Sequence, residues 1–269
     1  MLIIAPCGLC LKVAELQRSH LLPAGTYRRL RENEQSNPNP VFVHQDVTVK
    51  TSSQVRQPFL CRDCENRFGK GGESWFLINC FQQDKSFPLQ HFLARSTAVA
   101  HNRANDTSIY FSSQIPEIAG DKLLYFAASI FWRTAATSWN GFVQRKPVHI
   151  ELGKYLEPLR LFLLDEADFP QHMTLQVYVS SWADNLELAM FPHEVTKTHL
   201  HRYRVTILGL TFILGVGNRI SQNDCDACFV RSPLGGPVCV DPRMDVKIIE
   251  EAKRVAFASE AAKGLRILG

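Results

Sequence analysis

The chain has 269 residues, of which 45% are hydrophobic and 21% are charged, and its net charge is +4. This composition is that of an ordinary globular protein with enough apolar side chains for a large core. It argues against a secreted or membrane-spanning chain, because no signal-like segment is present and the longest apolar run, residues 205–216, is too short for a bilayer span. We therefore expect a soluble, cytoplasmic protein without a membrane partner.

The basic excess is confined to the N-terminal part of the chain. Residues 1–70 carry ten Lys or Arg against six Asp or Glu, whereas the remaining 199 residues carry 20 of each kind. A local positive charge is typical of a surface that docks on a phosphate backbone. A mixed, solvated surface is the simpler alternative, because four charges is a small excess. We expect nucleic acid as a partner.

The first predicted elements surround a pair of cysteines. Cys7 and Cys10 form a C-x-x-C pair, in which Gly8 allows the tight turn that brings two sulfur atoms onto one ion. The composition of residues 26–32 then predicts a short helix. Residues 41–49 are rich in β-branched side chains and predict a strand.

A second C-x-x-C pair, Cys61 and Cys64, stands at the start of a predicted helix over residues 62–82, which the glycine-rich stretch 69–72 weakens or bends. Two such pairs supply four thiolates, the ligand set of a closed structural zinc site. The alternative is that these are unrelated thiols of an apolar core. Without a secretory signal, this spacing indicates a metal site rather than disulfides.

From residue 86 onward the pattern predicts a larger unit. Residues 122–139 are apolar on most faces and predict a long helix that forms a buried spine. The other predicted elements are a helix over 155–165, strands over 173–180 and 203–215, and a closing helix over 245–266.

The predicted fold class is α+β with two domains. Residues 1–85 form a zinc-stapled module with a long insertion between its cysteine pairs. Residues 86–269 form a larger α+β domain with a long buried helix and an antiparallel sheet. The larger domain would position a substrate, regulate the module or bind a protein partner.

Three side chains of the N-terminal module are candidates for chemistry. A neutral imidazole at His20 suits the proton transfer that a metal-dependent nuclease requires. Glu65 directly follows Cys64, where its carboxylate would bind a hard cation, and Glu73 lies on a similar helical face. The alternatives are a hydrogen-bonded structural histidine and a first-turn glutamate favoured by the helix dipole. Six basic residues are candidates for phosphate contact: Arg18, Arg28, Arg29, Arg62, Arg67 and Lys70.

The order of these motifs resembles the HNH nuclease family in its treble-clef (ββα-metal-like), four-cysteine form. The resemblance rests on the first C-x-x-C pair, the run Ser-His-Leu-Leu-Pro at 19–23 and the run Phe-Leu-Cys-Arg-Asp-Cys-Glu-Asn-Arg-Phe at 59–68. It covers about residues 5–80. In a group of poorly characterised bacterial HNH-like proteins the likeness continues through the Ser-Ile-x-Trp-Arg helix to about residue 160.

The resemblance implies a metal-dependent endonuclease that hydrolyses phosphodiester bonds, with DNA favoured and bacterial defence as one setting. His20 matches the general base, and Glu65 stands where the family usually has a metal-binding histidine. Ser19 stands where the family usually has an Asp or His ligand. The family's central asparagine has no clear match, and Gln57 is the nearest side chain of similar type. The implied cofactors are structural Zn²⁺ and catalytic Mg²⁺ or Mn²⁺.

Ser19 keeps other hypotheses open, because a hydroxyl alone binds a divalent ion weakly. One is a catalytically degenerate, zinc-stabilised module that binds nucleic acid. Another is an interaction protein in which residues 86–269 bind a protein partner. We expect Trp132 in the core and Arg133 on a helix surface.

A third group of cysteines lies near the C-terminus. Cys225, Cys228 and Cys239 offer three thiolates, and a loop with incidental cysteines is the alternative to a second zinc site. Four further side chains are candidate ligands for such a site: Asp224, Asp226, His199 and His201.

Overall fold

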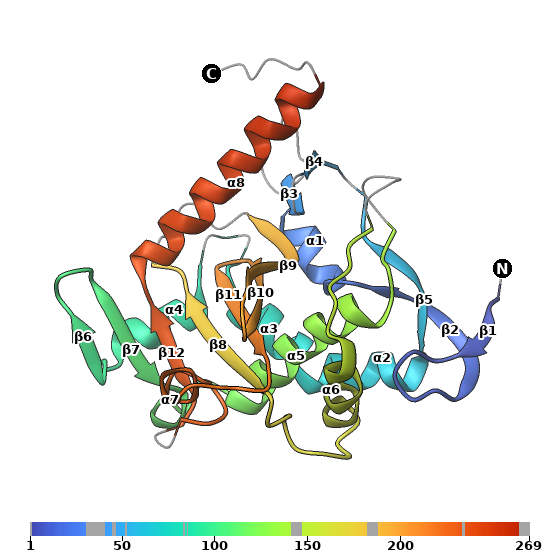
Figure 1. Ribbon diagram of the computed structural model, residues 1–269, viewed down its shortest axis with the longest axis horizontal. Helices are drawn as coiled ribbons and strands as arrows, with labels where there is room; N and C mark the ends of the chain where they lie inside the picture. Colours follow the sequence, from blue (N-terminus) through green and yellow to red (C-terminus); the bar gives the residue numbers. More distant parts are fainter. Residues whose placement is uncertain are drawn as a thin grey trace.

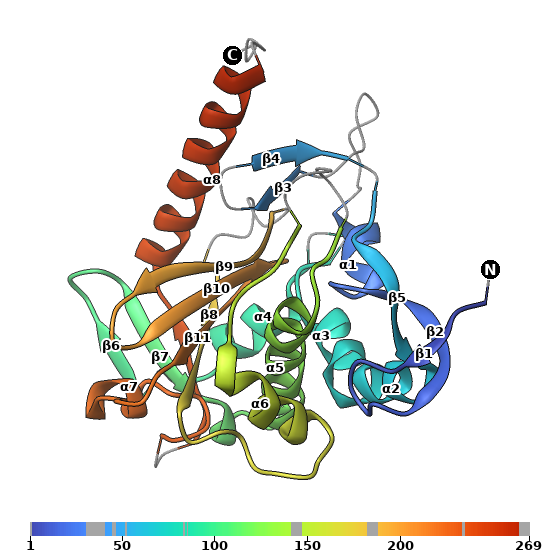
Figure 2. The same ribbon diagram turned by 45° about the vertical axis from the view of Figure 1, so that its right-hand side comes forward.

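A computed structural model describes residues 2–30, 41–44, 47–51, 53–82, 84, 86–140, 147–181, 188–232 and 235–263. These residues form an α+β fold with a small N-terminal sheet and a large mixed sheet, which confirms the predicted fold class at this level. Figures 1 and 2 place the small sheet on the opposite side of the central helix α5 (Gly120–Ala136) from the β6–β7 hairpin at the edge of the large sheet.

The small sheet has three antiparallel strands in the order β1-β2-β5. They are β1 (Ile4–Pro6), β2 (Val13–His20) and β5 (Arg56–Cys61). Three helical segments follow β5 without a break: α2 (Arg62–Phe68), the π-helical turn η1 (Gly69–Glu73) and α3 (Ser74–Asn79). The glycine-rich stretch therefore widens the predicted helix into a π turn, a feature frequent at functional sites.

The large sheet has nine strands in the order β4-β3-β9-β10-β11-β8-β12-β7-β6. Its strands are β3 (Val41–His44), β4 (Val47–Lys50), β6 (Ala100–Asn102), β7 (Thr107–Phe111), β8 (Met173–Val179), β9 (Ala189–Lys197), β10 (His201–Ile207), β11 (Leu210–Val216) and β12 (Pro237–Val240).

The prediction of a purely antiparallel sheet is wrong in two places, because β3 pairs with β9 and β12 pairs with β8 in parallel. Each of these pairs joins segments far apart in the chain, and only a long connection permits parallel pairing.

The apolar run predicted as one strand over residues 203–215 is a hairpin of β10 and β11. Leu208 and Gly209 form its turn with φ angles of 47° and 84°. Two residues with positive φ are the geometry of a tight hairpin connection, and glycine adopts it without strain. The run looked continuous because Leu208 is as apolar as the strands that it joins.

The core is built around α5, as predicted for a buried spine. Phe126 stacks on Phe76 of α3 with ring centroids 3.9 Å apart, and Trp132 lies 5.5 Å from the ring of Phe59 on β5. One buried cluster thus contains side chains from both sides of residue 85. The domain boundary at that residue stays a prediction.

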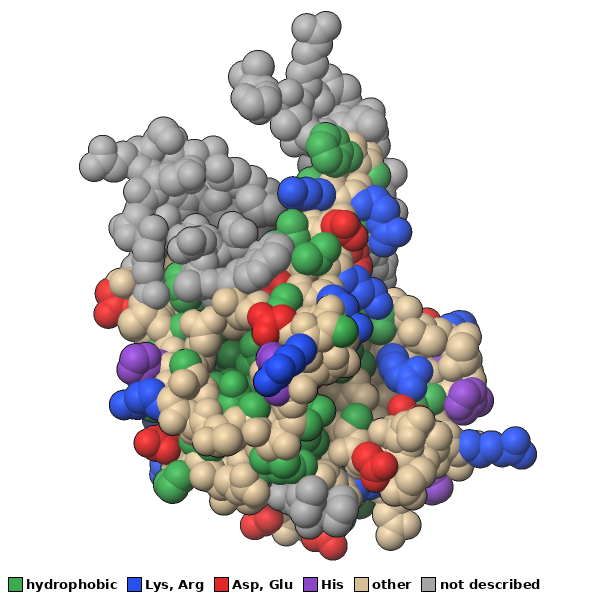
Figure 3. All heavy atoms as spheres, turned by 90° about the vertical axis from the view of Figure 1, so that its left-hand side faces the viewer, with side chains coloured by type: hydrophobic (Ala, Val, Ile, Leu, Met, Phe, Trp, Pro, Cys, Tyr) green, Lys and Arg blue, Asp and Glu red, His purple; other side chains and the backbone are tan. Residues whose placement is uncertain are grey.

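The remaining helical segments lie around the sheets: α1 (Ala24–Arg29), α4 (Pro88–Arg95), η2 (Ser112–Gln114), η3 (Gly153–Tyr155), α6 (Leu156–Leu163), α7 (Gln222–Asp226) and α8 (Pro242–Lys263). Helix α8 projects from the body, and hydrophobic, basic and acidic side chains alternate along it (Figure 3). Within the described residues, no helix combines the length and the hydropathy that a membrane crossing needs.

Candidate metal centre and its surroundings

The first cysteine pair lies in the tight connection between β1 and β2. The Leu11 N–H donates to the Cys7 carbonyl at 2.9 Å, and Leu11 itself has a positive φ of 61°. Gly8 packs against β5, because a Cβ atom at this position would come within 2.2 Å of the Phe59 ring. Gly8 is not among the glycines with a positive φ, so glycine is required here by close packing on Phe59 and not by the turn geometry that the sequence suggested.

The second pair lies where β5 passes into α2, so that both pairs meet at one end of the small sheet. The four sulfur atoms of Cys7, Cys10, Cys61 and Cys64 all lie within 4.8 Å of one another. The Cys10 and Cys61 Sγ atoms are 3.9 Å apart. Tetrahedral zinc with Zn–S bonds of about 2.3 Å would separate its sulfur ligands by about 3.8 Å. The donor set therefore fits a structural metal such as zinc.

The electrostatics of the four thiols point the same way. A hydrogen bond from Cys64 holds the pKa of Cys7 at about 4, and the Cys61 N–H also donates to this sulfur at 3.3 Å. The same hydrogen bond to Cys7 raises the pKa of Cys64, and burial raises the pKa of Cys61. The hydrogen bonds among the sulfur atoms thus lower the pKa of Cys7 and raise that of Cys64. A dication would stabilise all of them as thiolates.

His20 ends β2, at the opposite end of that strand from the cysteines. Its Nε2 atom lies 2.7 Å from Oε1 of Gln54, which precedes β5. An amide oxygen only accepts, so Nε2 donates this hydrogen bond, and in the neutral ring Nδ1 is then the acceptor nitrogen. Among the described residues, none makes a hydrogen bond with Nδ1. The partly exposed imidazole is therefore held in one orientation with a basic nitrogen available.

The two candidate carboxylates differ in their partners. Glu73 ends η1 and forms an ion pair with the guanidinium of Arg133, which is 2% exposed. One carboxylate oxygen of Glu65, Oε1, is buried and has no hydrogen-bond partner among the described residues. A buried carboxylate oxygen without a partner is costly, so a bound cation or water would stabilise it. Arg133, which we expected on a helix surface, is buried because it pairs with Glu73.

Ser19 and Gln57 have structural roles. The Ser19 hydroxyl is 1% exposed and accepts from the Leu60 N–H at 3.0 Å, where the pairing of β2 with β5 shifts register. The Gln57 amide donates to Thr137 Oγ1 at 3.1 Å and ties β5 to the end of α5. Neither side chain is directed toward a metal ion by these contacts.

The six basic candidates do not form one patch around His20. Arg29 is partly buried and donates to the Leu77 carbonyl and, at 3.0 Å, to Cys80 Sγ. Arg67 and Lys70 line an open groove of about 1270 Å³ that runs from Cys10, Cys61 and Cys64 to α5 and α6. The other three, which are Arg18, Arg28 and Arg62, are exposed on β2, α1 and α2.

This groove does not contain His20 or Glu65. Its lining carries five basic side chains against four acidic ones, so it offers little net attraction for a phosphate backbone. This groove and the candidate imidazole are therefore separate features, which sequence patterns alone gave no means of foreseeing.

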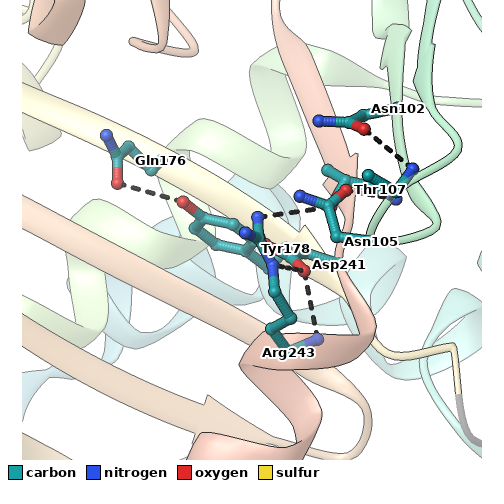
Figure 4. Close-up of polar contacts among 8 residues, drawn as sticks. Asn102, Asn105, Thr107, Gln176, Tyr178, Asp241 and Arg243 are labelled. Carbon is teal, nitrogen blue, oxygen red and sulfur yellow. Dashed lines mark hydrogen bonds and ion pairs between the residues drawn. The ribbon is translucent and has the colours of Figure 1, made fainter.

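The C-terminal cysteines do not converge as the N-terminal ones do. Cys228 is buried and its sulfur accepts from the Leu175 N–H at 3.4 Å, whereas Cys239 lines a cleft of about 460 Å³ between β7, β8, β12 and α7. Burial raises the pKa of Cys239 to about 12, which favours the neutral thiol. The neighbouring Asp241 forms an ion pair with Arg243, whose Nε and Nη2 atoms donate to the carboxylate at 3.0 and 2.9 Å (Figure 4). In the described part of the chain, the four N-terminal cysteines are the one group that could hold a metal.

Comparison with known proteins identifies no protein similar to this chain. The chain matches no protein-family model, no curated protein and no solved structure.

Proposed function

We propose that the N-terminal module is an HNH-like, metal-dependent endonuclease of treble-clef type, with His20 as general base and DNA as the favoured substrate. The observation that carries the proposal is the imidazole of His20, whose Nε2 atom lies 2.7 Å from Gln54 Oε1 and whose Nδ1 atom makes no hydrogen bond with the described residues. The four cysteines at the other end of β2 hold the module together, and we assign them to structural Zn²⁺.

In this proposal His20 Nδ1 takes a proton from a water molecule, and the water oxygen attacks the phosphorus. The bond from phosphorus to the leaving sugar oxygen breaks, and that oxygen takes up a proton from solvent. Mg²⁺ or Mn²⁺, held by Glu65, would neutralise negative charge on the phosphate. Mg²⁺ commonly uses one or two protein carboxylates and completes its coordination with water and substrate oxygens. One carboxylate therefore suffices, and Glu73 is left to its ion pair with Arg133.

A cleavage assay on plasmid and single-stranded DNA with Mg²⁺, Mn²⁺ or chelator tests this function. We expect metal-dependent cutting by the wild type and a loss of about a hundredfold or more in His20→Ala and Glu65→Gln, with zinc content unchanged. His101→Ala and Glu250→Gln are matched controls, because both residues are exposed and lie outside the site. Cutting that persists in His20→Ala would refute the assigned base.

The second candidate is a non-catalytic module that binds nucleic acid, and Ser19 favours it. The Ser19 hydroxyl accepts a hydrogen bond from a backbone N–H. The position that carries a metal ligand in the HNH family therefore has no free metal-binding group here. This candidate predicts DNA binding that weakens steeply with salt and no cutting with any metal. Binding that is absent at low salt would favour a protein-interaction role instead.

A further inference from the structure

Arg133 joins three segments of the candidate site. Its Nη1 atom donates to the backbone carbonyls of His20 at 2.9 Å and Leu21 at 3.4 Å, where β2 ends. Its Nη2 atom pairs with the Glu73 carboxylate of η1. The guanidinium also lies 4.4 Å from the ring centroid of Phe68 at the end of α2. A helix of the larger predicted domain thus reaches the backbone of the candidate base.

Close packing brings η1 to this arginine. A Cβ atom at Gly72 would come within 2.4 Å of the Lys122 carbonyl of α5, and one at Gly71 would come within 2.4 Å of the Tyr125 ring. Both glycines are therefore required for η1 to lie directly on α5, and Glu73 follows them immediately. On the other side, the Trp139 indole N–H donates to the Arg133 carbonyl at 2.8 Å and fixes the end of the helix.

The contacts of His20 divide into two kinds. Gln54 holds the imidazole ring, whereas Arg133 holds the carbonyl oxygen of the same residue. A guanidinium has a rigid planar fork, so it fixes the relative positions of the groups that it bridges. Because the direction of a side chain follows its backbone, displacement of the His20 carbonyl would also displace the imidazole from Gln54.

We propose that Arg133 is the positioning residue for His20, so that α5 is part of the candidate site and the N-terminal module does not form that site alone. That Arg133 holds the backbone of His20 follows from the contacts described above. That this contact matters for cleavage rests on the proposed function. Arg133 does not touch the reacting atoms in this proposal. It acts through the strand end and through Glu73.

The chain supplies a matched control. Arg204 of β10 is 1% exposed and pairs with Glu251 of α8, just as Arg133 is 2% exposed and pairs with Glu73. In each arginine the Nε atom is buried without a hydrogen-bond partner among the described residues. Substitution of either arginine by lysine therefore disturbs a buried ion pair of the same kind, but only Arg133 contacts His20.

The first test compares the imidazole ¹H–¹⁵N NMR signals of full-length Arg133→Lys and Arg204→Lys, with His20 assigned by the loss of its signals in His20→Ala. We expect Arg133→Lys to change the tautomer signals of His20 and to leave those of His193 in place. Arg204→Lys should do the reverse, since Arg204 lies beside His193. Unchanged His20 signals in folded Arg133→Lys would overturn the proposal. Glu73→Gln, which keeps the shape of the side chain, gives the same test if Arg133→Lys does not fold.

The second test measures cleavage with the same variants. Arg133→Lys should lower kcat between about tenfold and about a hundredfold with little change in KM, as a displacement of about 1 Å at a base would cause. Arg204→Lys should retain wild-type kcat. Equal losses in both variants would show that Arg133 is merely structural. If the wild type does not cut DNA, the proposed function fails, and the NMR comparison alone decides whether Arg133 positions His20.

Discussion

Two regions of the molecule contain the same kinds of residue in different arrangements. The N-terminal region has two C-x-x-C pairs that meet in one cluster, a buried Arg133–Glu73 pair and His20. The far side of the large sheet has its own C-x-x-C motif, a buried Arg204–Glu251 pair and His193. His193 is 8% exposed and both of its ring nitrogens face oxygen atoms, at 2.9 Å from Phe191 and 3.0 Å from Glu251.

The difference between the two histidines separates a structural role from the chemical role that we propose for His20. Both nitrogens of His193 are occupied in packing α8 against β9 and β10, whereas His20 keeps one nitrogen free at a partly exposed strand end. Residue types alone do not distinguish these sites. What distinguishes them is how many hydrogen-bonding atoms the fold leaves without a partner.

The largest expected effect concerns the two groups of cysteines. Cys61→Ser/Cys64→Ser should lose its zinc and unfold the small sheet, because binding a structural zinc ion contributes on the order of 10 kcal/mol to folding. Cys225→Ser/Cys228→Ser should keep the zinc and lose only about 1–2 kcal/mol, since Cys228 accepts one buried N–H. Metal analysis and urea unfolding measure both effects. Retained zinc in the first variant, or two equivalents of zinc in the wild type, would contradict this comparison.

An intermediate effect should separate the two histidines. His193→Ala removes a partner from the partly buried Glu251 carboxylate and should lower the free energy of unfolding by about 2 kcal/mol without affecting cleavage. His20→Ala removes one partly buried hydrogen bond and should cost about 1 kcal/mol or less while abolishing cleavage. Urea unfolding and the DNA assay, run on the same preparations, test whether His193→Ala loses mainly stability and His20→Ala mainly cleavage. A larger stability loss in His20→Ala would mean that this histidine is also structural.

The features that were predictable from the sequence are those with local signatures. The spacing of Cys7, Cys10, Cys61 and Cys64 predicted their cluster, and the apolar character of residues 122–139 on most helix faces predicted the buried helix α5. Both patterns reflect constraints on neighbouring residues, namely metal-ligand spacing and burial of all helix faces.

The features that were missed depend on contacts between distant segments. Arg133 was expected on a helix surface, whereas it is buried against its partner Glu73, which lies 60 residues earlier. Ser19 was considered as a metal-ligand position, although its hydroxyl is used by the Leu60 N–H across the strand pair. A single sequence carries no local signal for either contact, because one forms only when η1 packs on α5 and the other only when β2 pairs with β5.

The smallest expected effect is a pH dependence in the region of His193. Burial raises the pKa of Glu251, but His193 and Arg204 outweigh burial and hold that pKa at about 2, below its ordinary 4.5. A depressed carboxyl pKa stabilises the folded state above the unfolded pKa, and this stabilisation disappears as the pH falls from about 4.5 toward about 2. Because the carboxyl group is partly exposed, we expect about 1–2 kcal/mol rather than the larger value that the full shift implies. Glu251→Gln should therefore be less stable than the wild type at pH 7 and should approach it near pH 2. Urea unfolding of both proteins across this range measures the difference, and a gap that stayed constant with pH would show that packing of the side chain, not its charge, stabilises the contact of α8 with the sheet.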